Sequence, residues 1–288
     1  MQVNVDGTQS SGNCTYADWQ NQWHWETNDT KPAAIFAAEE TESATTVTSR
    51  LFACMVNFSS GQLLVFGGQN DAAANNDTWV FEPFAGAGWR LVSGHPAPVG
   101  RWSAGCCSEG SMMYMHGGAA DNALSLSDLW SFNITSLKWT QLLSSTCNAD
   151  PSTCSLAMRG HVFVKFMSFL YAWDTLAGRL ARFNLVSNAW ESLISPSVQR
   201  FQHLSIAQIS SHAFLSLGLT IDATSNVVFL IKFPPSGSQV EFKLVNASEV
   251  PLVVGGCMLA FSSQILVLGG KPTSSAPSNR YRCSSLCF

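Results

Sequence analysis

The sequence predicts an all-β propeller in which five four-stranded blades form a ring. Three observations favour this fold. Landmark residues recur about every 50 positions, short apolar segments alternate with turns rich in Gly, Asn and Ser, and a glycine pair follows the second apolar segment of a repeat. Four strand-like segments per repeat at this period are typical of a propeller with one blade per repeat.

The first two repeats, residues 50–92 and 101–143, match each other most closely. Asp77 and Asp128 recur just ahead of the third strand of each repeat, where we interpret them as turn residues that bond their own backbone. The repeats also share an arginine ahead of the first strand, a glycine pair after the second, and tryptophans in the third and fourth. These are Arg50 and Arg101, Gly67-Gly68 and Gly117-Gly118, Trp79 and Trp130, and Trp89 and Trp139.

This combination of landmarks resembles the kelch-repeat β-propeller family, and the resemblance extends from about residue 50 to the C-terminus. It implies that the glycine pair adopts positive φ angles where the backbone approaches a neighbour closely. It also implies that the two aromatic side chains of each repeat fill the wedge between adjacent blades.

The later repeats are more divergent. Residues 159–194 carry Trp173-Asp174 in place of the glycine pair, and residues 200–246 carry Phe242 in place of the fourth-strand tryptophan. Residues 255–288 repeat the glycine-pair pattern but end too early for four strands. We therefore expect residues 14–27, with Trp23, to complete this fifth blade and close the ring, which leaves no free sheet edge.

Two insertions interrupt the period, at residues 28–49 and 143–158. The first contains a short predicted helix over Lys31–Glu40, with a proline in its first turn. The second contains Cys147 and Cys154. A six-residue loop separates these cysteines, so we expect a disulfide, with free thiols as the alternative.

The composition narrows the classes of function. Hydrophobic residues make up 46% of the 288-residue chain and charged residues 12%, with a net charge of -4. A large core is therefore expected, and no basic stripe is available for nucleic acid. The apolar stretches have the length of strands, far short of a bilayer span.

Nine cysteines leave at least one thiol without an intramolecular partner. Cys14 lies near the predicted N-terminal strand, and a disulfide to Cys283 or Cys287 would join the two ends of the ring. Cys54, Cys106 or Cys107, and Cys257 fall at similar places in first strands. They are interpreted as buried apolar residues, with bridges between neighbouring strands or a thiolate metal site as alternatives.

Six Asn-x-Ser/Thr sequons indicate a secreted or cell-surface glycoprotein, although no signal peptide opens the sequence. A cytosolic protein with accidental sequons is the alternative. The candidate N-glycosylation sites all fall in or beside predicted turns: Asn13, Asn28, Asn57, Asn76, Asn133 and Asn246.

The expected function is a non-catalytic protein-interaction or assembly module, with other proteins or copies of itself as partners, in an extracellular structure. No motif of a catalytic, metal or cofactor site is present. The alternative is a carbohydrate-active kelch-like enzyme, of the oxidase or mutarotase type, that uses the axial pocket. Four arginines that precede first strands are candidates for binding acidic partners, or else for hydrogen bonds to carbonyls of the adjacent blade: Arg50, Arg101, Arg159 and Arg200.

Overall fold

The computed structural model describes most of the chain between residues 47 and 245. The described ranges are 47–48, 50–70, 73–83, 88–93, 96–121, 124–144, 156–193, 200–221, 226–233 and 240–245, except the side chains of 203–205 and 226. Six further strands, at 23–25, 253–254, 257–261, 264–268, 271–272 and 284–286, are described by their backbone. The predicted helix over Lys31–Glu40 lies outside these residues.

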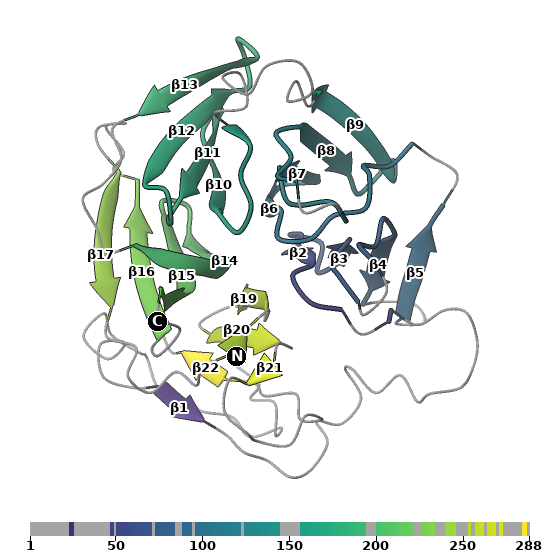
Figure 1. Cartoon of the computed structure of the whole chain (residues 1–288). Coiled ribbons are helices and arrows are strands. Elements are labelled where there is room, and N and C mark those ends of the chain that lie inside the picture. Colours follow the sequence, from purple (N-terminus) through teal and green to yellow (C-terminus); the bar gives the residue numbers. More distant parts are fainter. Residues whose placement is uncertain are drawn as a thin grey trace.

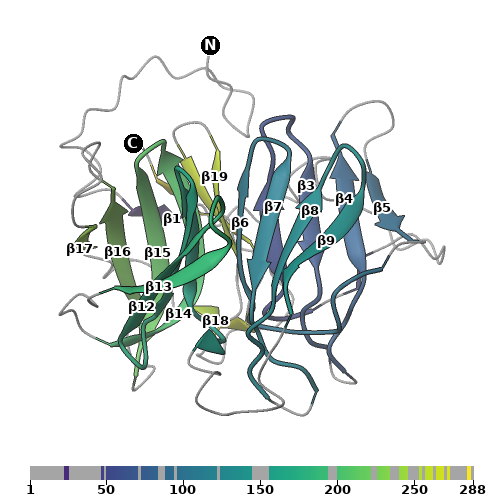
Figure 2. The ribbon, with the colours of Figure 1, turned by 90° about the horizontal axis from the view of Figure 1, so that it is seen from above.

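Four antiparallel four-stranded sheets stand around a central axis, each with its strands in sequence order, so the predicted propeller is confirmed (Figure 1). Seen from the side, the strands run roughly along the axis of the ring (Figure 2). The first blade comprises β2 (Cys54–Asn57), β3 (Leu63–Phe66), β4 (Thr78–Glu82) and β5 (Gly88–Val92), and the second β6 (Gly105–Glu109), β7 (Met112–His116), β8 (Leu129–Asn133) and β9 (Lys138–Leu143). The third comprises β10 (Val162–Phe166), β11 (Phe169–Asp174), β12 (Arg179–Asn184) and β13 (Ala189–Leu193), and the fourth β14 (Phe201–Ser210), β15 (Ala213–Thr220), β16 (Asn226–Lys232) and β17 (Glu241–Val245).

The fifth position of the ring differs from the predicted four-stranded blade. Its strands form three two-stranded pairs: β19 (Cys257–Phe261) with β20 (Gln264–Leu268), β18 (Val253–Val254) with β21 (Lys271–Pro272), and β1 (Trp23–Trp25) with β22 (Ser284–Leu286). The last two pairs include only two and three residues per strand, too few to join the three pairs into one continuous sheet. The N-terminal strand nevertheless pairs with the C-terminal one, with Trp23 opposite Leu286.

The cores lie between adjacent blades. We call the interface of the first and second blades the first wedge, that of the second and third the second wedge, and that of the third and fourth the third wedge. Each is filled by apolar side chains from two sheets, such as Phe66 and Met113 in the first wedge and Val164 and Phe229 in the third. Burial of these faces supplies the main stabilisation of the ring.

In the second, third and fourth blades, the aromatic residue of the fourth strand reaches back into the wedge with the preceding blade, as expected for these positions. In the first wedge, the indole nitrogen of Trp139 also donates a hydrogen bond to the Thr78 hydroxyl of the preceding blade at 3.0 Å. The partner ring stands in each case at the same second-strand position, which lies immediately ahead of the glycine pair in the first two blades. Trp173 holds this position in the third blade, opposite Val162 as Phe66 is opposite Cys54. Asp174-Thr175, and not Trp173-Asp174 as predicted, therefore replaces the glycine pair. The ring-centroid distances are 4.9 Å for Trp139 and Phe66, 5.0 Å for Trp190 and His116, and 4.5 Å for Phe242 and Trp173.

The glycine pairs let the next blade approach. Gly67 and Gly117 have φ of 66° and 64°, and a Cβ atom on either would lie within 2.6 Å of a backbone oxygen of the following blade. Gly68 donates its N–H to the carbonyl of Arg101 at 2.9 Å, and Gly118 donates to Met158 at 2.8 Å. These contacts show which residues are equivalent in successive blades.

Candidate functional site

One side of the ring collects the long connections of the blades, and we call it the loop face. It comprises the described residues of the connections from second to third strands, at 67–70, 73–77, 117–121 and 124–128. It also comprises residues 50–53, 101–104 and 158–161, which lead into first strands. The antiparallel register brings these segments together, because Cys54 at the start of β2 lies opposite Phe66 at the end of β3. The turns that join first to second strands and third to fourth strands lie on the opposite side.

An arginine and an aspartate form a bidentate ion pair beneath the loop face in each of the first two blades. The Nη1 and Nη2 atoms of Arg101 lie 2.7 and 2.8 Å from the two carboxylate oxygens of Asp128, and Nη1 also donates to the carbonyl of Gly117 at 2.9 Å. Trp130 donates its indole N–H to the same carboxylate at 2.8 Å. Arg101 is 1% exposed and therefore has no free donor surface for a partner.

The first blade repeats this arrangement nearer to solvent. Arg50 lies 2.5 and 2.9 Å from the carboxylate oxygens of Asp77, and Trp79 donates to Asp77 at 2.6 Å. Each aspartate accepts hydrogen bonds from an arginine and a tryptophan, which the interpretation as turn residues did not include. Asp77 also accepts from its own backbone, as that interpretation expected. Burial raises the pKa of Asp77 and of Asp128, but these hydrogen bonds outweigh burial and hold both pKa values below 3.8.

The four candidate arginines are not equivalent, which corrects the predicted register of the later blades. Met158 takes the place of Arg101 in the third blade, as the bond from Gly118 shows. Phe201 takes it in the fourth, where its carbonyl accepts from the Thr175 hydroxyl at 2.5 Å. Both side chains are fully buried, whereas Arg159 and Arg200, one position away in sequence, are exposed.

The reason for this change is the connection between β11 and β12. It is a tight turn over residues 175–178, with no carboxylate at the place of Asp77 or Asp128, so an arginine in the third blade would be buried without a counter-ion. Arg50 and Arg101 donate to the glycine carbonyl of their own blade, rather than to the carbonyls of the adjacent blade that the alternative expected.

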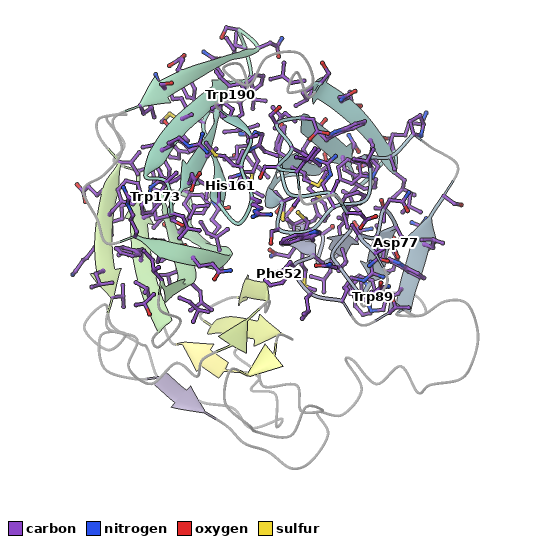
Figure 3. The ribbon with its side chains drawn as sticks, viewed as in Figure 1. Phe52, Asp77, Trp89, His161, Trp173 and Trp190 are labelled. Carbon is purple, nitrogen blue, oxygen red and sulfur yellow. The ribbon has the colours of Figure 1, made fainter. Side chains whose placement is uncertain are left out.

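A row of side chains crosses three blades on the loop face. The rings of Phe52 and Trp102 lie 5.9 Å apart, and the guanidinium carbon of Arg159 lies 5.6 Å from the centre of the Trp102 ring. Phe52 lies at the inner end of the first blade, near the middle of the ring (Figure 3). Two backbone hydrogen bonds connect the three blades beneath the row. Ser103 N–H donates to the Phe52 carbonyl at 2.9 Å, and Gly160 N–H donates to the Ser103 carbonyl at 2.8 Å.

Exposed apolar side chains also lie in the connections on this side of the ring. Of the nine large hydrophobic side chains that are exposed within the described ranges, five lie on the loop face or in its connections. Their exposed fractions run from 37% to 66%, and they are Leu51, Val99, Leu124, Leu176 and Ile221. An apolar surface with arginines at its margin has the composition of a protein-binding face.

The structure describes some of the predicted cysteine and N-glycosylation positions. Cys54, Cys106 and Cys107 are not in disulfides; Cys54 is buried as expected, whereas Cys106 and Cys107 are half-buried. Burial raises the pKa of Cys107 well above its usual value. Asn57 and Asn133 are the last residues of β2 and β8, whereas Asn76 is exposed between β3 and β4. Outside the described side chains lie Cys14, Cys147, Cys154, Cys257, Cys283, Cys287, Asn13, Asn28 and Asn246.

The structure also shows groups that sequence reasoning did not bring together. His116 and His161, from the second and third blades, are hydrogen-bonded inside the second wedge. A small cavity in the third wedge is lined by apolar side chains together with Tyr171 and Trp173. Within the described ranges, no cluster of three or more His, Cys, Asp or Glu side chains could hold a metal ion.

Comparison with known proteins places this geometry in a family. A stretch of 77 residues is 39% identical to an F-box/kelch-repeat protein of Arabidopsis thaliana and covers 24% of this chain but only 16% of that relative. Among the described residues, no helix is long and apolar enough to span a membrane. Residues 12–218 match the family model of the KLHDC2/KLHL20/DRC7 Kelch-repeats domain. With its glycine pairs, arginine–aspartate pairs and wedge-filling aromatics, the chain belongs to this kelch-repeat family.

Proposed function

We propose that the chain is a protein-interaction module that binds its partner on the loop face, through the row of Phe52, Trp102 and Arg159. The observation that carries this proposal is the position of Arg159 over the Trp102 ring, at 5.6 Å from its centre. The pair offers a cation beside an apolar plane. It suits a segment of a partner protein in which a carboxylate stands next to an aromatic or aliphatic side chain.

Two properties of the row support this role. Tryptophan and arginine are the residues that most often dominate the energy of protein interfaces. The bonds from Ser103 and Gly160 fix the backbone beneath the row, so little conformational freedom is lost when a partner binds. The exposed Arg200 adds a further positive charge for an acidic partner.

The proposal is tested with synthetic peptides that combine Asp or Glu with Phe, Leu or Trp, compared with peptides of the same composition in which Lys replaces the acidic residues. We expect fluorescence polarisation to show binding of the acidic set alone. Trp102→Ala and Arg159→Ala should each weaken binding by about 30-fold, the effect of losing roughly 2 kcal/mol at a hot spot.

Lys138→Ala is the matched control, because Lys138 is an exposed cation at the start of β9, on the opposite side of the ring. It should leave binding unchanged. If both loop-face variants bind like the parent chain, the proposed face is wrong. Sedimentation of the parent chain with and without peptide distinguishes a foreign partner from a second copy of the chain.

The compartment is part of the proposal, as a secreted or cell-surface glycoprotein. Asn76 supports it, because its side chain is exposed on a connection of the loop face. Thr78 of the same sequon is buried and accepts the hydrogen bond of Trp139, so a glycan must be added before the chain folds. Intact mass of material secreted from eukaryotic cells, with and without glycosidase, is the test. A mass that equals the bare chain would contradict it.

A further inference from the structure

The second wedge contains a pair of histidines where the first and third wedges have apolar contacts. His116 is 0% exposed and His161 is 1% exposed, and Nδ1 of His116 lies 3.1 Å from Nε2 of His161. His161 lies near the inner end of the third blade (Figure 3). At this distance one ring donates and the other accepts, so the neutral pair shares a single hydrogen.

The equivalent positions in the neighbouring blades show that the pair replaces packing residues. Phe66 and Trp173 stand at the place of His116, at the end of the second strand. Ala104 stands at the place of His161, just ahead of the first strand. Gly105 makes room for the larger side chain, because a Cβ atom at Gly105 would lie 2.5 Å from Nε2 of His161.

The surroundings of the pair are poor in groups that stabilise a positive charge. The ring of His116 lies 5.7 Å from Phe163 and 5.0 Å from Trp190, and its Nε2 atom has no hydrogen-bond partner among the described residues. The charged groups that face it are Asp128 and Arg101, which already neutralise each other at 2.7 Å.

The other titratable groups near this wedge do not compensate. On β13, Glu191 is paired with Arg182 at 2.8 Å. Burial raises the pKa of Cys107 and of Tyr114, so both remain neutral in acid. A proton on the histidine pair therefore has no free carboxylate beside it in the described part of the wedge.

We propose that the second wedge is an acid-sensitive joint: when the His116–His161 pair takes up a proton, the joint opens, while the first wedge stays closed. A charged His116 must bury an imidazolium whose Nε2–H has no acceptor, and a second proton would set two N–H groups against each other. Opening lets water solvate these groups. At the equivalent places, the first wedge has Phe66 and Ala104.

The direction of the effect follows from the pKa of His116. Burial lowers it from 6.5 to about 4, and the attraction of Asp128 only partly offsets burial. The opened joint therefore binds the proton first as the pH falls. The neutral histidine pair stabilises the closed wedge fully above pH 6.5, and this stabilisation is lost as the pH falls from 6.5 to 4. The difference between the two pKa values favours the open form by about 30-fold at pH 5 relative to pH 7.5.

Hydrogen–deuterium exchange measured by mass spectrometry tests this on the whole chain, with rates corrected for the intrinsic effect of pH. Between pH 7.5 and pH 5, peptides that cover β7 and β10 should lose protection by about 30-fold, whereas the peptide that covers β3 should not change. An equal loss at β3 would overturn the proposal. The readout needs no partner, so its outcome is independent of the proposed binding function.

The double variant His116→Phe/His161→Ala gives the second wedge the residues of the first wedge, because Phe66 is equivalent to His116 and Ala104 to His161. It should remove the difference between pH 7.5 and pH 5, whereas His212→Gln, at the half-buried turn between β14 and β15, should keep it. A double variant that still loses protection in acid would contradict the proposal. If this variant does not fold, imidazole NMR of the parent chain decides, because titration of His116 at its ordinary pKa of 6.5 would exclude the mechanism.

Discussion

Arg101 and Met158 occupy equivalent places in successive blades, one as a buried ion and the other as a buried thioether. The comparison shows what each side chain requires. Arg101 is stabilised by the bidentate contact to Asp128 and by the Gly117 carbonyl, whereas Met158 needs only apolar neighbours. A buried ion pair contributes little net free energy over an apolar contact, but breaking it from one side costs a great deal.

Arg101→Met should therefore lower the free energy of unfolding by about 3 to 5 kcal/mol, because it leaves Asp128 buried without its counter-ion. Urea denaturation measures the loss. Arg50→Met is the internal comparison and should cost clearly less, since the Asp77 side chain is 28% exposed and can be hydrated. The double variant Arg101→Met/Asp128→Leu should recover part of the loss; a double variant less stable than Arg101→Met would contradict this account.

At the scale of one residue, the sequence predicted the landmarks better than their roles. The glycine pairs and wedge tryptophans were recognisable because their backbone and volume requirements are local. The register of Arg159 and Arg200 was not, because an arginine one position away from the true equivalent looks the same in sequence. The backbone bond from Gly118 to Met158 shows the equivalence in the third blade, and the bond from the Thr175 hydroxyl to Phe201 shows it in the fourth.

At the scale of the secondary-structure elements, the first strand of each blade must match the blade on either side. β6 begins with Gly105, where β2 begins with Cys54 and β10 with Val162. This glycine leaves space for His161, which packs against it from the third blade. The composition of one strand thus depends on a side chain that comes 56 residues later.

Gly105→Ala should destabilise the chain by about 2 kcal/mol, because the added methyl group would lie 2.5 Å from both His161 Nε2 and Phe163 Cβ. Thermal unfolding followed by circular dichroism measures the effect. His161→Ala in the Gly105→Ala background should restore part of the loss, as it removes one of the two clashes. Cys54→Ala, which keeps a Cβ atom at the equivalent place in the first blade, should cost less than Gly105→Ala.

The strands of the four complete blades were predictable, because turn residues and alternating apolar segments mark each of them. The histidine pair was not, since His116 and His161 are far apart in sequence and neither has a local signature. A comparison with Phe66 at the same repeat position was the available signal. It shows a titratable imidazole where the first and third blades have the apolar rings of Phe66 and Trp173.

At the scale of the whole molecule, the ring depends on its two ends. The pairing of β1 with β22 was predictable from the orphan segment around Trp23, because a closed ring needs a partner for its last sheet. The reduction of the fifth blade to two-stranded pairs was not, since sequence patterns do not report how many hydrogen bonds a short strand can form with its neighbours.

Removal of residues 1–26 should lower the midpoint of urea unfolding and promote self-association, because β22 loses its partner and presents an unpaired edge. Urea denaturation and light scattering are the measurements. Removal of residues 1–11, which lie ahead of the part that matches the family model, is the control and should leave both unchanged. A chain without residues 1–26 that stays monomeric and equally stable would show that β1 is dispensable.

The contact between Trp23 and Leu286 also sets the order of events during synthesis. Each of the four complete blades consists of consecutive strands, so its sheet can form as soon as that stretch of the nascent chain leaves the ribosome. β1 emerges first and must wait, without its partner, until β22 has been made. This long-range pairing is the slowest contact to form by loop closure, so the half-open ring is the intermediate most exposed to aggregation.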